Sequence, residues 1–156
     1  MALDNALLKE FDELLTHYPD KRSALIPALH RVQEENGGWI SPELMEDLAK
    51  YLDLPPVEVF GVVTFYPMFR IRPRGKHLVN ICHNISCDLR GAQDVVAKVC
   101  ELTGAHPGGT SPDGRFTVAT VECQGACTAA PMFELDGVFH ENLDDARIEK
   151  ILGAVR

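Results

Sequence analysis

Apolar residues in the first third of the chain recur every three or four positions, as they do on amphipathic helices. Such stripes cover residues 3–15, 25–32 and 44–52. Each is followed by a helix-stopping pair, in turn Tyr18-Pro19, Gly37-Gly38 and Pro55-Pro56. The pattern predicts three helices that share an apolar core.

Residues 57–66, VEVFGVVTFY, fit two patterns. Their β-branched and aromatic side chains favour a strand, whereas Val59, Phe60 and Val63 lie on one face of a helix. We interpret the segment as a fourth helix. The Pro- and Gly-containing stretch over residues 67–76 is typical of a linker. Residues 1–72 are therefore predicted to form an N-terminal helical bundle.

Beyond the linker, strands and helices alternate. Asp136-Gly137 between two apolar runs is a strong signal for a β-hairpin. The expected elements are a strand at 77–82, a helix at 89–102 that ends at Gly104, a strand at 116–121, a hairpin of 132–135 with 138–140, and a final helix at 148–155. This order predicts an α/β (α+β) chain, in which a thioredoxin-like layer over residues 73–156 follows the bundle.

Composition narrows the possible functions. The 156 residues are 46% hydrophobic and 24% charged, as in a globular protein, and the net charge of -8 argues against nucleic-acid binding. The longest apolar run, residues 59–69, is too short to span a membrane, which predicts no direct membrane insertion. The first residues lack the basic and apolar regions of a signal peptide. We therefore expect a cytoplasmic protein.

Four of the five cysteines form two closely spaced pairs. Cys82 and Cys87 are a C-x4-C pair after one predicted strand, and Cys123 and Cys127 are a C-x3-C pair after another. In a reducing compartment such cysteines are used for metal binding or redox chemistry. If the two strands are parallel neighbours joined by the intervening helix, both loops leave the same sheet edge. The four sulfurs then converge, as a [2Fe–2S] cluster requires.

Both pairs are expected in loops, because regular helix or strand geometry restricts sulfur directions. Gly125 would let the second loop turn sharply. Structural zinc is an alternative for four cysteines, although its ligands have other typical spacings. A thiol–disulfide enzyme fits less well because the chain lacks a C-x-x-C pair. Cys100, on the apolar stripe of a predicted helix, is interpreted as a buried free thiol, and His83 as a neighbour of the site rather than a ligand.

These residues resemble a known family. The cysteine spacing, the string VECQGACTAAPM, and the upstream segments SALIPALHRVQEENGGWIS and LPPVEVFGVVTFYPMF are together similar to the NuoE-type subunit of respiratory complex I, NADH:quinone oxidoreductase. The resemblance implies a helical bundle followed by a thioredoxin-like [2Fe–2S] ferredoxin domain. It also places the cluster ligands at Cys82, Cys87, Cys123 and Cys127.

The resemblance implies a partner as well: a NuoF-type subunit that carries FMN, oxidises NADH and exchanges single electrons with the cluster. A hydride donor delivers two electrons together and a flavin usually separates them. The chain has no G-x-G-x-x-G after a strand, so we expect FMN and NADH on the partner and no NADH oxidation by this chain alone. Two alternatives remain: the equivalent diaphorase subunit of a soluble NAD-dependent formate dehydrogenase or hydrogenase, and a zinc-stabilised interaction module.

Overall fold

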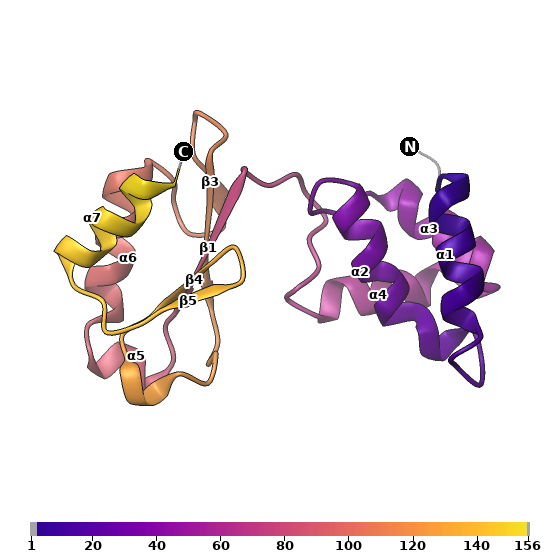
Figure 1. Ribbon diagram of the computed structural model, residues 1–156, viewed down its shortest axis with the longest axis horizontal. Coiled ribbons are helices and arrows are strands. Elements are labelled where there is room, and N and C mark those ends of the chain that lie inside the picture. Colours follow the sequence, from indigo (N-terminus) through magenta and orange to yellow (C-terminus); the bar gives the residue numbers. More distant parts are fainter. Residues whose placement is uncertain (1–2, 156) are drawn as a thin grey trace. The chain divides into compact units, whose positions relative to one another are not determined.

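The computed structural model describes residues 3–155 (Figure 1). The chain forms two compact units, Met1–Pro73 and Arg74–Arg156. The first is helical and the second combines helices with a sheet, each around its own hydrophobic core. Within residues 3–155, no helix combines the length and apolar character needed to cross a bilayer.

Four α-helices and a short 3-10 helix make up the first unit. They are α1 (Asn5–Leu15), η1 (Arg22–Ala24), α2 (Leu25–Glu35), α3 (Pro42–Leu52) and α4 (Pro56–Phe65). Their apolar stripes meet in one core, in which Leu29, Leu48 and Val59 are completely buried. The predicted helices are confirmed, and the ambiguous segment over residues 57–66 is helical because its Val residues complete this core.

Local sequence sets the ends of these helices. Asp4 accepts a hydrogen bond from the Leu7 N–H at 2.8 Å at the start of α1, and Ser41 caps α3 by accepting from the Leu44 N–H. Pro42 occupies the first position of α3, where a missing N–H costs nothing. Asp53, with φ of 57°, ends α3 in the left-handed region. The capping signals in the sequence therefore place the helix boundaries correctly.

The second unit is built on a five-stranded sheet. Its elements are β1 (His77–Cys82), α5 (Ile85–Leu89), α6 (Ala92–Thr103), β2 (Gly109–Thr110), β3 (Phe116–Val121), the 3-10 helix η2 (Cys127–Ala129), β4 (Phe133–Leu135), β5 (Val138–His140) and α7 (Asp145–Ala154). The strand order is β2-β3-β1-β4-β5, with β1 parallel to β3 and the other pairs antiparallel. This confirms the predicted α/β fold class.

One face of the sheet carries the core of this unit. Val79 and Ile81 of β1 and Phe133 of β4 are completely buried against apolar residues of α6 and α7. Figure 1 shows α6 and α7 on the same side of the sheet. Because side chains alternate along a strand, the residues between them, Leu78 and Asn80, lie on the opposite face.

Three predictions for this unit need correction. The helix expected from Leu89 begins at Ala92, because Gly91, with φ of 89°, separates α6 from the short α5, where Leu89 is exposed. The turn-rich connection after α6 contains a short strand, β2. The hairpin is confirmed, although its first strand begins at Phe133 rather than at Met132.

Candidate metal centre

The two cysteine pairs follow the ends of neighbouring parallel strands. Cys82 is the last residue of β1 and lies opposite Val121, the last residue of β3. Cys123 follows Val121 by two residues. The helix α6 lies between β1 and β3 in the chain, as expected for a crossover connection. The predicted parallel pairing is therefore confirmed, and it brings both pairs to one edge of the sheet.

The expectation that all four cysteines lie in loops is wrong. Cys82 belongs to β1, Cys87 to the five-residue helix α5, and Cys127 begins η2; Cys123 alone lies in a loop. Asn84 caps α5 by accepting a hydrogen bond from the Ile85 N–H at 3.0 Å. Short helices can aim one side chain at the site because nothing requires them to continue.

Cys82 and Cys87 are buried side chains. They are 3% and 2% exposed and pack in a small cluster with Ala92, Ala130 and Met132. Burial raises the pKa of Cys87 to about 11, and a hydrogen bond with the Cys82 thiol acts in the same direction. A hydrogen bond from the Met132 backbone N–H lowers the pKa and partly opposes this. Without a metal these two thiols stay protonated.

Cys123 and Cys127 form an exposed pair whose sulfurs are 3.5 Å apart. Gly125 between them has φ of 87°, which confirms the predicted sharp turn. The hydrogen bond with Cys123 raises the pKa of Cys127, and a hydrogen bond with the Ser86 side chain lowers it. Since Ser86 lies in α5 beside Cys87, this contact joins the two pairs.

The thiols fit a group that takes its ligands two at a time. Each iron of a [2Fe–2S] cluster needs two protein thiolates, and the structure presents one buried and one exposed pair. Cys127 also interacts electrostatically with Cys82 and Cys87, so the pairs lie close together. In residues 3–155, no three or more His, Cys, Asp or Glu side chains surround a single ion position.

Glu122 is a contributor that sequence reasoning missed. Its carboxylate accepts a hydrogen bond from Asn84 Nδ2 at 2.7 Å and lies 3.9 Å from His83 Nε2. The side chain therefore holds the segment after β1 against the segment after β3. Its position directly before Cys123 was the available signal, but Asn84 lies 38 residues away in the chain.

Cys100 is separate from the two pairs. It lies in α6 and is half-buried rather than fully buried as expected, because it is at the margin of the apolar stripe. Burial raises its pKa, with no contribution from another cysteine. His83 is 40% exposed in its side chain and contacts Glu122.

Comparison with known proteins agrees with this geometry. Residues 11–156 match the family described as thioredoxin-like [2Fe-2S] ferredoxin. The chain belongs to this family. Its ferredoxin-like unit is therefore the second unit, since β1, β3 and their two cysteine pairs all lie there.

Relatives of this ferredoxin match it over most of their length. A NuoE-type protein of the NADH-quinone oxidoreductase of Rhizobium meliloti is 38% identical over 148 residues, 95% of this chain and 88% of the relative. The NADH-quinone oxidoreductase subunit 2 of Thermus thermophilus is also 38% identical, over 93% of this chain and 81% of its own. The resemblance to NuoE-type subunits is confirmed.

A solved structure shows the same fold. A chain of an NAD+-reducing [NiFe]-hydrogenase superposes with a TM-score of 0.72 and 23% identity, over 85% of this chain and 22% of that chain. At this identity the likeness concerns the fold alone. The bundle and the ferredoxin-like unit therefore also occur within a much longer polypeptide.

Proposed function

We propose that this ferredoxin is an electron-transfer subunit of NADH:quinone oxidoreductase, with a [2Fe–2S] cluster held by Cys82, Cys87, Cys123 and Cys127. The observation that carries the proposal is the meeting of two thiol pairs at the ends of parallel strands β1 and β3. Relatives named as subunits of that enzyme, aligned over most of both chains, support the assignment.

The chain's own residues have distinct roles in this proposal. When bound, the cluster supplies reversible one-electron transfer. Cys82 and Cys87 hold it against Met132 and Ala130, which exclude water from that side. The Met132 N–H donates to the Cys87 sulfur, a contact of the kind that raises a cluster's reduction potential. Cys123 and Cys127 face solvent, so electrons exchange most easily on that side.

The proposed partner is a NuoF-type subunit that holds FMN and NADH within a larger respiratory complex. A flavin converts the two electrons of a hydride into single electrons that a [2Fe–2S] cluster can accept. We place the chain in the cytoplasm, at the inner face of the membrane through that complex.

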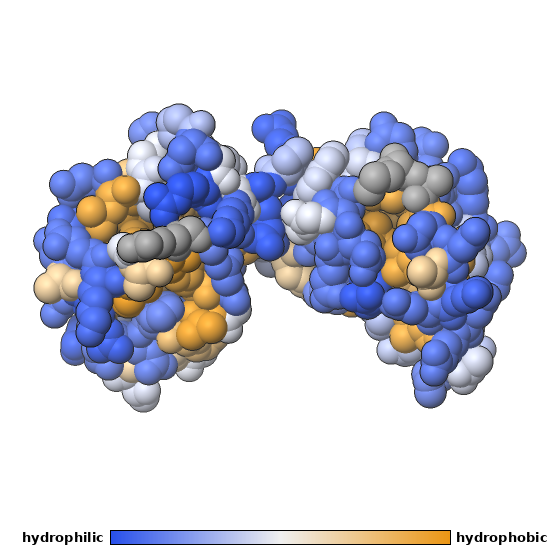
Figure 2. Space-filling model, turned by 45° about the horizontal axis from the view of Figure 1, so that its top comes forward, coloured by the Kyte–Doolittle hydropathy of each residue, from blue (hydrophilic) through white to orange (hydrophobic). Residues whose placement is uncertain are grey.

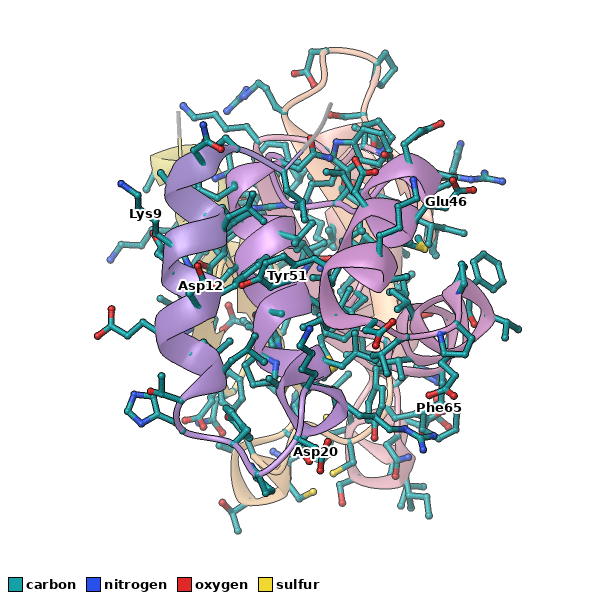
Figure 3. The ribbon with its side chains drawn as sticks, turned by 90° about the vertical axis from the view of Figure 1, so that its right-hand side faces the viewer. Lys9, Asp12, Asp20, Glu46, Tyr51 and Phe65 are labelled. Carbon is teal, nitrogen blue, oxygen red and sulfur yellow. The ribbon has the colours of Figure 1, made fainter. Side chains whose placement is uncertain are left out.

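The helical domain, residues 1–72, is proposed to dock on the partner through α4. Val57 and Phe65 are 73% and 77% exposed, and Phe60 is 50% exposed. Figure 3 shows Phe65 pointing away from the helices. Helices that are apolar all round are normally buried. A partner surface over α4 would remove these side chains from water, which stabilises the complex.

One anaerobic preparation tests the cluster. We expect two irons and two sulfides per chain, visible absorption, and a paramagnetic signal after reduction. One zinc per chain without visible absorption would overturn the proposal in favour of a zinc-stabilised module. Co-purification from the native organism tests the complex: a NuoF-type flavoprotein with quinone-reducing subunits is expected. Recovery with a hydrogenase or formate dehydrogenase large subunit would instead assign the chain to a soluble diaphorase.

A further inference from the structure

A groove lies beside the edge strand β5, away from the cysteine pairs. Its volume is about 950 Å³, and it runs between the β4–β5 hairpin and the outer flank of α7. The apolar lining comes from both sides: Leu135, Val138, Ala146, Ile151, Ala154 and Val155. Val138 is 59% exposed within it. Figure 2 shows that hydrophobic residues reach the surface of this unit. The groove is thus an apolar surface that the described chain leaves uncovered.

The backbone of β5 is open along the same edge. Leu135 and Val138 close a two-residue turn, so they form a hydrogen-bonded pair, and the next pair, Glu134 with Phe139, does not. Glu134 bonds instead to Asn80 of β1, as the flanking bonds from Cys82 N to Met132 O and from Asp136 N to Leu78 O require. The Phe139 N–H and C=O therefore point outward. No strand among residues 3–155 pairs with that side.

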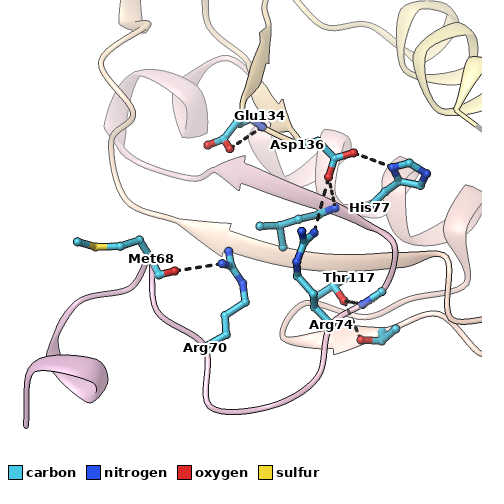
Figure 4. Close-up of polar contacts among 11 residues, drawn as sticks. Met68, Arg70, Arg74, His77, Thr117, Glu134 and Asp136 are labelled. Carbon is cyan, nitrogen blue, oxygen red and sulfur yellow. Dashed lines mark hydrogen bonds and ion pairs between the residues drawn. The ribbon is translucent and has the colours of Figure 1, made fainter. Parts of the chain in front are cut away.

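The acidic groups of the groove already have partners. Asp136 accepts from His77 Nδ1 at 2.6 Å and from the Leu78 N–H at 2.9 Å, and Arg74 lies 3.8 Å away (Figure 4). Asp144 caps α7 by accepting from the Arg147 N–H. Neither carboxylate is available to a ligand.

The cationic groups are different. The side chains of Arg147 and Lys150 both line the groove, one helical turn apart on α7. Neither has a salt bridge within the part of the chain that the structure describes. The groove thus presents two uncommitted positive charges on a protein with a net charge of -8.

We propose that this groove binds an extended segment of another subunit, which adds a sixth strand beside β5. The Phe139 N–H and C=O pair with its backbone, alternate apolar side chains fill the space above α7, and carboxylates on it pair with Arg147 and Lys150. The inference rests on the proposed function only for the presence of a multi-subunit enzyme. It does not depend on which residues hold the cluster.

Other occupants match fewer of these features. A fatty acid would fill the apolar lining and pair with Lys150, but it would leave the Phe139 N–H and C=O unpaired. A second copy joined through β5 would place its own Arg147 and Lys150 at the same interface, where like charges repel. An acidic and apolar peptide strand satisfies the backbone, the lining and the charges together.

Hydrogen–deuterium exchange tests the strand without any substitution. The Phe139 amide should exchange rapidly in the isolated full-length chain and at least about tenfold more slowly in the purified complex, since a hydrogen-bonded amide exchanges only on opening. Equal rates in both would overturn the proposal. Slowing in the isolated chain that grows with its concentration would also overturn it, in favour of a second copy.

Two matched pairs of variants test the contacts. Phe139→Pro removes the outward N–H without removing a ladder bond of the hairpin, and Phe139→Leu keeps it. Lys150→Glu reverses a groove charge, and Lys9→Glu reverses an exposed lysine on α1 (Figure 3). We expect Phe139→Pro and Lys150→Glu to weaken retention of the chain in the complex about tenfold, with both controls unchanged. Equal retention of all four variants would contradict the proposal.

The same preparations separate this inference from the proposed function. Iron content and the reduced paramagnetic spectrum of the Lys150→Glu chain should match those of the unaltered chain, because the groove lies away from the cysteines. If the cluster is present but Phe139 remains unprotected in the complex, the strand proposal alone fails. If the chain contains no iron but Phe139 is protected, the cluster proposal alone fails.

Discussion

The two units of this ferredoxin bury their apolar side chains in different ways. The helical unit has a single core to which all four α-helices contribute. The second unit has two clusters, a larger one between the sheet and α6 and α7, and a small one that includes Cys82 and Cys87 themselves. Two of the side chains proposed to hold the iron–sulfur cluster are thus part of the apolar packing of their unit.

This difference shows where a cofactor contributes to stability. The helical core is complete without a bound group, since burial of its apolar side chains is the dominant stabilising term. The small cluster consists mainly of cysteine, alanine and methionine, so it buries little area. A group that binds only the folded state stabilises that state by mass action. We therefore expect the iron–sulfur cluster to stabilise the second unit and not the first.

The largest effect should follow from Cys87→Ser. Serine is a poor cluster ligand, and Cys87 is one of two thiols on the buried side. We expect loss of the cluster, seen as loss of bound iron and visible absorption, together with faster proteolysis of residues 74–156 than of residues 1–73. Cys100→Ser is the matched control and should keep its iron. Loss of iron in the Cys100 variant, with retention in the Cys87 variant, would show that the ligand set is wrong.

Leu48→Ala should affect the other unit. Leu48 is completely buried, and truncation of such a residue typically costs about 3 kcal/mol through lost burial and a residual cavity. The chain's single tryptophan, Trp39, lies in this unit, so its fluorescence in urea reports unfolding there, while visible absorption reports the second unit. Leu89→Ala, at an 82% exposed position, should leave both transitions unchanged. Simultaneous loss of both signals in the Leu48 variant would contradict independent cores.

Gly125→Ala tests the exposed sulfur pair. An added Cβ meets no atom within 4 Å, but φ of 87° strains any residue other than glycine by roughly 1–2 kcal/mol. We expect the cluster to be lost several times faster to a chelator, because the turn no longer holds Cys123 beside Cys127. Gly114→Ala is the control, with φ of 72° and equally open surroundings. Equal loss rates for the two variants would show that the Gly125 turn does not matter to the site.

The smallest effect concerns a bond between α1 and α3. Tyr51 Oη donates to Asp12 Oδ1 at 2.5 Å (Figure 3), and Tyr51→Phe should cost about 1 kcal/mol. Burial first, and then Asp12, raises the pKa of Tyr51 from 10.0 to about 12. A raised pKa means that the folded state favours the protonated phenol. The advantage over Tyr51→Phe in urea unfolding should be full below pH 10 and disappear towards pH 12. An advantage independent of pH would exclude this hydrogen bond.

Much of the fold could be predicted because its signals are local. Helical spacing, Ser41 before Pro42, and Asp136-Gly137 each determine the structure within a few residues. Local signals misplaced the start of α6, because Leu89 continues the apolar spacing while Gly91 ends α5. They also missed β2, whose two residues form a strand only by pairing with β3.

The candidate site divides in the same way. Cysteine spacing and the strand pattern by themselves determined which four thiols can meet, because a crossover helix of suitable length makes parallel neighbours of β1 and β3. Only the tertiary structure decided that one pair is buried and the other exposed, that Glu122 joins the two segments, and that β5 borders an open groove. These features depend on contacts between residues far apart in the chain, and no short stretch of sequence contains both partners.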